Sequence, residues 1–149
     1  MSATNTAATA STAPAAVTGT HLSRRADIAT RALQIVLALF MGVASAAPKL
    51  VGHSSAAESF DKIGYGDWFM YLMGGLELAG AVALLIPILS GVSAIAFMGL
   101  MIGAFTYQVT VFDGQYAITP VILFFVFAGI AWARRNHTAD LVALVRKRV

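Results

Sequence analysis

Four long apolar runs dominate this chain, and they set the strictest limit on what it can fold into. The runs cover residues 28–47, 68–89, 92–112 and 117–133. A helix of about 20 apolar residues spans the hydrocarbon core of a bilayer. A soluble fold of 149 residues has too little interior to bury four such segments. The sequence therefore predicts an integral membrane protein in which each run is a transmembrane helix.

Composition agrees with this prediction and excludes several other classes. Hydrophobic residues make up 58% of the chain and charged residues 11%, whereas soluble domains average about 45–50% and about 25%. The chain has no cysteine, and its three histidines lie outside the apolar runs without ligand spacing, so we expect no metal site. A pI of about 9.6 would suggest nucleic-acid binding in a soluble protein. Here the basic residues border apolar runs, and we expect the lipid bilayer, not nucleic acid, as the partner.

The chain divides into three parts. Residues 1–26 are rich in alanine, threonine and serine, and are predicted to form a disordered cytoplasmic tail. Residues 27–135 form the membrane domain, and residues 136–149 a short basic cytoplasmic segment. Within the membrane domain, Ser55-Ala-Ala-Glu58 matches a capping box and predicts a short surface helix. The links after the second and third runs are short, which favours an all-α, antiparallel up-down four-helix bundle.

Lysine and arginine predict the orientation of this bundle. Only Lys49 and Lys62 fall on the side opposite the termini. The other eight basic residues flank the two ends of the membrane domain: Arg24, Arg25, Arg31, Arg134, Arg135, Arg146, Lys147 and Arg148. Because cytoplasmic flanks carry the excess of lysine and arginine, both termini are predicted to be cytoplasmic, with the protein in the plasma membrane.

The first apolar run has a second interpretation. Arg24-Arg25, the run itself and then Ala44-Ser45-Ala46 before Pro48 resemble a cleaved secretion signal. Cleavage near Ala47 would leave three spans instead of four. N-terminal sequencing of the purified protein separates the two interpretations.

Glu77 is the residue that stands out inside an apolar run. At about 1.5 Å rise per residue it lies near the bilayer midplane, where an unpaired charge costs several kcal/mol. Gly74, Gly80 and Ala81 lie one turn away and would let another helix approach, so we expect Glu77 to face the bundle interior. It is either a proton, cation or ligand site, or a buried acid that is hydrogen-bonded for packing.

Polar residues from two other runs are candidates to reach Glu77. Ser45 and Lys49 lie on one stripe of the first run, and the Lys49 side chain can extend either back toward Glu77 or up to the headgroups. Gln108, with Tyr107 beside it, lies in the outer half of the third run. We expect its amide either to form an interhelical hydrogen bond or to contact a ligand. No catalytic residue is identified. Close helix packing is predicted at Gly42, Gly74, Gly80, Gly99 and Gly103.

The first run ends in Gly42-Val-Ala-Ser-Ala-Ala-Pro-Lys49-Leu50. The second run contains Gly74-Gly75-Leu76-Glu77-Leu78-Ala79-Gly80 and closes with Leu84-Leu85-Ile86-Pro87. Over residues 32–135 these three motifs resemble the DoxX-like family of membrane proteins. The first is similar to the family's glycine…lysine-leucine ending of the first span, the second to its glycine-x-x-glutamate-x-x-glycine segment, and the third to its leucine-leucine-x-proline. Many relatives carry a histidine near the outer end of the third span, where this chain has Gln108. No metal or proton-relay role is therefore carried over to that position.

The resemblance implies a function as well as a fold. The family takes its name from a subunit of an archaeal thiosulfate:quinone oxidoreductase, and other members are associated with redox-stress complexes. It therefore implies a membrane subunit or scaffold of a redox system, accessory rather than catalytic, with a quinone as ligand and a soluble oxidoreductase as partner. Two alternatives remain: a small proton-coupled transporter that acts as a homo-oligomer, and a structural or assembly protein without chemistry. Shared fold alone does not decide among them.

Overall fold

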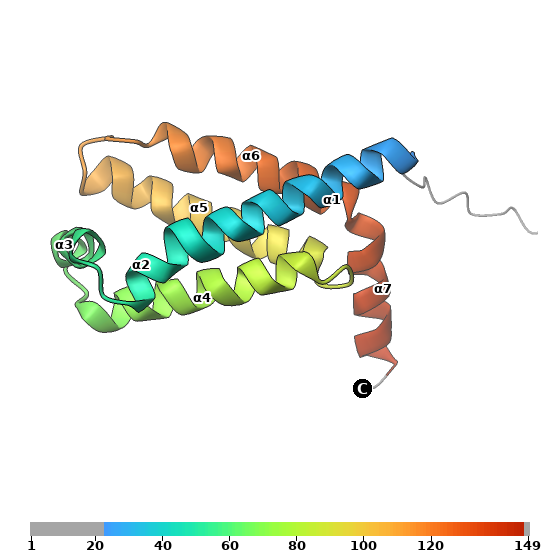
Figure 1. Ribbon diagram of the computed structural model, residues 1–149, viewed down its shortest axis with the longest axis horizontal. Coiled ribbons are helices and arrows are strands. Elements are labelled where there is room, and N and C mark those ends of the chain that lie inside the picture. The colour runs from blue at the N-terminus through green and yellow to red at the C-terminus, as the bar shows by residue number, and fades with distance from the viewer. Residues whose placement is uncertain (1–22, 148–149) are drawn as a thin grey trace, which may run out of the picture.

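The computed structural model describes residues 23–147 as a bundle of helices (Figure 1). The elements in chain order are α1 (Arg24–Leu39), η1 (Phe40–Ala46), α2 (Ala47–Leu50), α3 (Ser54–Ile63), α4 (Asp67–Leu85), α5 (Ser90–Thr110), α6 (Ile118–Ala133) and α7 (Arg135–Arg146). Every regular element in this range is helical, which confirms the predicted all-α class. The predicted disordered tail lies outside the described residues up to position 22, and its last residues already belong to α1.

Three helical segments of the described chain are long and apolar enough to cross a membrane. They are Arg24–Leu50, Asp67–Leu85 and Ser90–Thr110, and α6 gives a fourth candidate when it is counted together with α7. Many large apolar side chains point outward from these segments and are widely exposed, as expected where lipid replaces water around the protein. The chain is therefore a membrane protein with three or four apolar spans.

The first span is continuous through Pro48, although a proline interrupts an ordinary α-helix. Pro48 has no N–H to donate to the carbonyl of Ala44, and its ring crowds that carbonyl. The preceding turn, η1, is wound as a π-helix, in which the Ala47 N–H donates to the Gly42 carbonyl five residues back. The helix thus accommodates Pro48 through this wider turn and continues to Leu50.

The surface helix α3 begins earlier than its sequence motif suggests. The predicted capping box placed Ser55 at the cap, but the N-cap is His53, whose ring nitrogen accepts from the Ser55 N–H at 3.4 Å. The prediction missed this because it allowed only a hydroxyl as the capping group. Gly64 ends α3 with a φ of 86°, a left-handed conformation that favours glycine.

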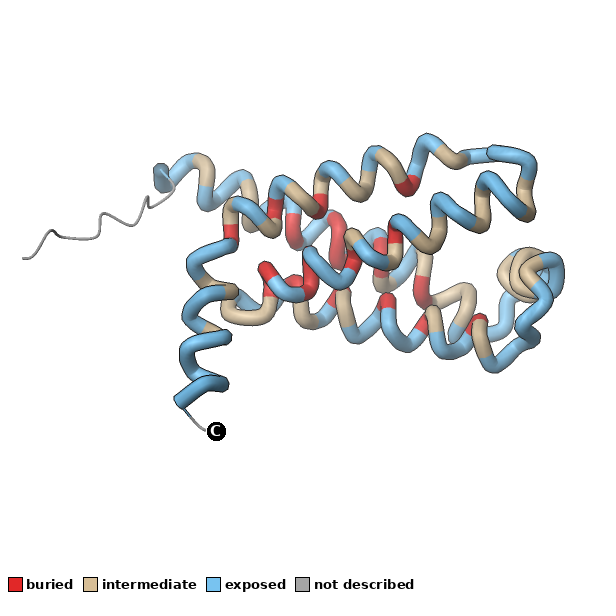
Figure 2. Tube along the Cα trace, turned by 180° about the vertical axis from the view of Figure 1, so that it is seen from behind, coloured by how far each residue is buried: buried red, intermediate tan, exposed pale blue. Residues whose placement is uncertain are grey.

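The long helices run side by side, and two short helices cross the two ends of the bundle (Figure 1). Helix α3 lies at one end, while the start of α1 and the whole of α7 lie at the other. Figure 2 shows that most buried positions gather in the middle of the bundle and toward α7. Met70, in the first turn of α4 near α3, is also buried. The core consists of Leu37, Ala38, Met41, Ala81, Leu84, Ala94, Phe97, Met101, Phe127 and Ile130. The rings of Phe97 and Phe127 are stacked at its centre, 4.7 Å apart.

Candidate functional site

Gly74 brings the end of the first span against α4. A Cβ atom at this position would lie 3.0 Å from the Cβ of Lys49 and 3.0 Å from the Cγ of Leu50, closer than most packed side chains come. A glycine here therefore permits α2 to approach α4 closely. Glu77 follows Gly74 by one helical turn, so the same contact places Lys49 beside it.

Lys49, Glu77 and Ser45 form one connected polar group between the first span and α4. The Lys49 Nζ lies 2.8 Å from the Glu77 Oε2 as an ion pair. The Ser45 hydroxyl donates to the same oxygen at 2.9 Å. Lys49 also donates to the Ser45 carbonyl at 2.9 Å and contacts the Ser45 Oγ at 3.0 Å. Of the two directions open to the Lys49 side chain from sequence, the structure shows the one toward Glu77.

Burial and pairing decide what this group can do chemically. The side chains of Lys49 and Glu77 are 17% and 7% exposed, so neither charge is well hydrated. Each charge neutralises the other, which offsets the high cost of an isolated charge inside a membrane. All three ammonium protons of Lys49 are engaged, whereas the Glu77 Oε1 accepts no hydrogen bond from any described residue. The site thus offers a free acceptor rather than a free donor.

Gln108 and Tyr107 are not joined to this group. The Gln108 side chain is half-buried and makes no hydrogen bond within residues 23–147, while its carbonyl accepts from the Gly114 N–H at 2.7 Å. The Tyr107 ring contacts the ring of Phe69 at 6.3 Å. Phe69 is the centre of an aromatic cluster at the α3 end of the bundle, which also contains Phe60, Tyr65 and Trp68.

The five glycines predicted to pack helices together behave differently. Besides Gly74, a Cβ at Gly80 would lie 2.8 Å from the Cζ of Phe97, and one at Gly42 would lie 3.5 Å from the Cβ of Ala81. A Cβ at Gly99 or Gly103 would meet no atom within 4 Å. These last two glycines therefore mediate no close helix contact within the described chain.

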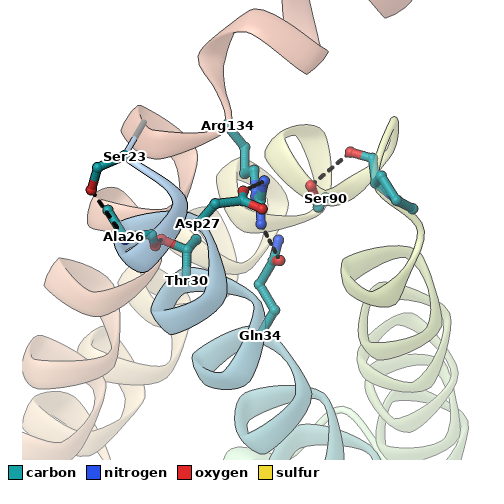
Figure 3. Close-up of polar contacts among 8 residues, drawn as sticks. Ser23, Ala26, Asp27, Thr30, Gln34, Ser90 and Arg134 are labelled. Carbon is teal, nitrogen blue, oxygen red and sulfur yellow. Dashed lines mark hydrogen bonds and ion pairs between the residues drawn. The ribbon is translucent and has the colours of Figure 1, made fainter. Parts of the chain in front are cut away.

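A second polar cluster, at the α7 end, was missed from sequence (Figure 3). Arg134 is 7% exposed and forms an ion pair with Asp27, and its Nη2 donates to the Gln34 Oε1 at 3.2 Å. The sequence reasoning counted Arg134 only as a flanking charge. The available signal was the spacing of Asp27 and Gln34, which are seven residues apart and so share one face of α1.

This cluster ties the first turns of α1 to the corner between α6 and α7. Arg134 is the residue at which the chain turns by 65° from α6 into α7. Two nitrogen atoms of this cluster, the Arg134 Nε and the Gln34 Nε2, are buried without a hydrogen-bond partner in the described chain. Because a guanidinium is planar and makes several hydrogen bonds at once, it fixes the direction of the chain at this corner.

The family comparison covers most of the membrane domain. The sequence model of the DoxX-like family matches residues 32–133. The chain belongs to the DoxX-like family. The matched region contains Ser45, Lys49 and Glu77, so the ion pair lies within the part that this DoxX-like protein shares with its family. Arg134 and α7 lie beyond it. No curated protein and no solved structure matches the chain.

Proposed function

We propose that this DoxX-like protein crosses the plasma membrane four times, has both termini in the cytoplasm, and acts as an accessory subunit or scaffold of a membrane-associated redox system. Two observations support the topology. Both ends of the described chain lie at the same end of the bundle, as an even number of crossings requires (Figure 1). Eight of the ten lysine and arginine residues flank that end in sequence, which favours the cytoplasmic side.

The observation that carries the functional proposal is the Lys49–Glu77 pair. Glu77 lies ten residues beyond Asp67, or about 15 Å along α4, and thus near the middle of the membrane. Placing an ionisable residue at this depth costs free energy, so such a residue is a functional candidate. Its pairing with Lys49 keeps it in place, and its free Oε1 remains able to accept one more hydrogen bond.

The donor and acceptor pattern favours the reduced form of a quinone as the ligand. The hydroxyl of a hydroquinone can donate to the free Glu77 Oε1. The carbonyl of an oxidised quinone needs a donor, and every Lys49 proton is already engaged, so it can bind only after a contact with Ser45 is broken. A bound hydroquinone would supply electrons and protons within the membrane. In this proposal Glu77 accepts its hydrogen bond, and Lys49 and Ser45 hold the Glu77 carboxylate in position.

Titration of the purified protein with a short-chain benzohydroquinone tests this assignment. A hydrogen bond to a charged acceptor contributes about 1.5–3 kcal/mol, so Glu77→Gln should weaken binding about ten- to hundred-fold. Ser45→Ala keeps both the carboxylate and the ammonium and should weaken binding less than Glu77→Gln does. Glu58→Gln, an exposed acid on α3, is the control for loss of one negative charge. Equal affinity in wild type and Glu77→Gln, with both proteins folded by circular dichroism, would remove the quinone from the proposal.

One observation favours a second candidate, a structural or assembly protein. All donors of Lys49 are engaged, and the Glu77 carboxylate accepts hydrogen bonds from Ser45 and Lys49. Close packing of two helices without any ligand would produce the same contacts. Affinity purification from native membranes in mild detergent distinguishes the two. A stoichiometric soluble oxidoreductase together with hydroquinone binding supports the redox role. A partner without redox cofactors, and no hydroquinone binding, supports the assembly role.

A further inference from the structure

Helix α7 differs from the other helices in its direction. It turns away from α6 by 65° at Arg134 and crosses the end of the bundle (Figure 1). Its first turns pack against the start of α5, where the Thr138 side chain fills the space beside Gly91. Its last turns extend past α4 without a neighbour in the described chain.

The face of α7 that contacts the bundle continues as an apolar face beyond it. His137, Thr138 and Leu141 on this face are half-buried. Leu144 and Val145, three and four residues after Leu141, continue the same face and are 50% and 56% exposed. Because this face points toward the bundle, it points toward the membrane in which the bundle lies.

The neighbouring side of α7 carries positive charge at both ends. A shallow groove on this side is lined by Arg135, Thr138, Ala139, Val142, Ala143 and Arg146. The two arginines stand at its two ends with small side chains between them. The Arg135 guanidinium also lies over the Trp132 ring, 4.8 Å from its centroid, and tryptophan is enriched at the membrane–water interface.

We infer that α7 is a membrane-surface helix that binds anionic phospholipids of the leaflet on its side of the bundle. Leu141, Leu144 and Val145 enter the boundary between headgroups and acyl chains, and Arg146 at the far end binds lipid phosphate. Amphipathic helices with basic polar sides bind membranes in this way. Arg134 supports this arrangement, because its contacts with Asp27 and Gln34 hold the corner from which α7 leaves.

The inference is independent of the redox proposal. It concerns α7, which lies outside residues 32–133 that match the DoxX-like family. It requires only that the bundle spans a membrane with α7 at its surface. Failure of hydroquinone binding therefore leaves it intact, and its own failure leaves the Lys49–Glu77 site intact.

Single-cysteine labelling of the full-length protein tests the position of α7. The chain contains no cysteine, so an introduced one is labelled uniquely. Val145→Cys reports on the apolar face, and Ala143→Cys, two residues away and nearly opposite around the helix, is its matched control. Each variant is labelled with an environment-sensitive fluorophore and reconstituted in vesicles of phosphatidylcholine alone or of equimolar phosphatidylcholine and phosphatidylglycerol. Acrylamide, an uncharged water-soluble quencher, measures exposure to water.

We expect the label at position 145 to be quenched several-fold less than the label at 143, with a larger difference when phosphatidylglycerol is present. Arg146→Glu should abolish the increase caused by phosphatidylglycerol. Lys62→Glu, the same charge change at the opposite end of the bundle, should leave it unchanged. Equal quenching at the two positions in both vesicles would overturn the inference, since α7 would then lie in water or inside a protein contact. If the difference in quenching between positions 145 and 143 changes neither with phosphatidylglycerol nor with Arg146→Glu, the role of anionic lipid is overturned.

Discussion

Replacing either partner of the Lys49–Glu77 pair should destabilise the protein more than replacing both. At the observed distance of 2.8 Å and an effective dielectric constant of about 20, their attraction is about 6 kcal/mol, much of it offset by the loss of hydration. Removing one partner leaves the other charge buried and costs about 3–5 kcal/mol. The double variant Lys49→Met/Glu77→Gln removes both charges, so its free energy of unfolding should lie within about 2 kcal/mol of the wild-type value.

The structure also predicts which single variant is worse. After Glu77→Gln, the long Lys49 side chain can extend toward the headgroups, and a glutamine still accepts a hydrogen bond from it. After Lys49→Met, the shorter Glu77 side chain remains inside the bundle with only Ser45 as a partner. Lys49→Met should therefore be the less stable of the two.

Reversible unfolding by dodecyl sulfate in mixed micelles, followed by far-ultraviolet circular dichroism, measures these free energies. Lys62→Met and Glu58→Gln remove the same charges from exposed positions of α3 and should each stay within about 0.5 kcal/mol of wild type. Two single losses of at least about 3 kcal/mol each, against at most about 2 kcal/mol for the double variant, give a coupling energy of at least about 4 kcal/mol between Lys49 and Glu77. If the two single effects simply add in the double variant, the pair is not coupled and the reasoning from its geometry is refuted.

Three further changes probe the packing and the corner. Gly74→Ala adds a Cβ only 3.0 Å from the Lys49 Cβ and should cost about 1–3 kcal/mol, whereas Gly99→Ala meets no atom and should stabilise α5 by up to about 1 kcal/mol in the same unfolding assay. Equal effects would mean that α2 and α4 are not closely packed. Arg134→Gln removes the ion pair with Asp27 and should cost about 1.5–3 kcal/mol while raising hydrogen exchange in α7. Unchanged exchange there would show that Arg134 does not hold the corner.

Much of the architecture could be predicted because membrane burial leaves a direct record in the sequence. Long apolar runs indicate spans, and the predicted membrane class and family are both confirmed. Glu77 was found because a carboxyl in an apolar run is rare, and small residues beside it marked a close helix contact. Gln108 could not be assigned from sequence, because the depth of a residue in one helix does not determine which side of the bundle it faces.

The cluster around Arg134 shows a different limit. A charge at the end of a span has the same sequence pattern whether it points to water or folds back into the bundle. Asp27 and Gln34 share one face of α1, but they meet Arg134 only when α1 lies beside the end of α6. Their spacing marks a polar face on α1, whereas the partner of that face is 100 residues or more away in sequence and no local pattern identifies it.

The π-helical turn before Pro48 has a consequence for how this segment tolerates insertions and deletions. A π turn holds about one residue more than an α-helical turn, and each residue in a helix rotates the chain by about 100°. Deleting one residue between Phe40 and Ala46 would convert the turn to ordinary α winding, with little effect on the length of the span. If the π turn persisted after the deletion, everything beyond it would rotate by that angle, and Lys49 would point away from Glu77. Whether Glu77 keeps its partner after such a deletion thus depends on whether this turn changes its winding.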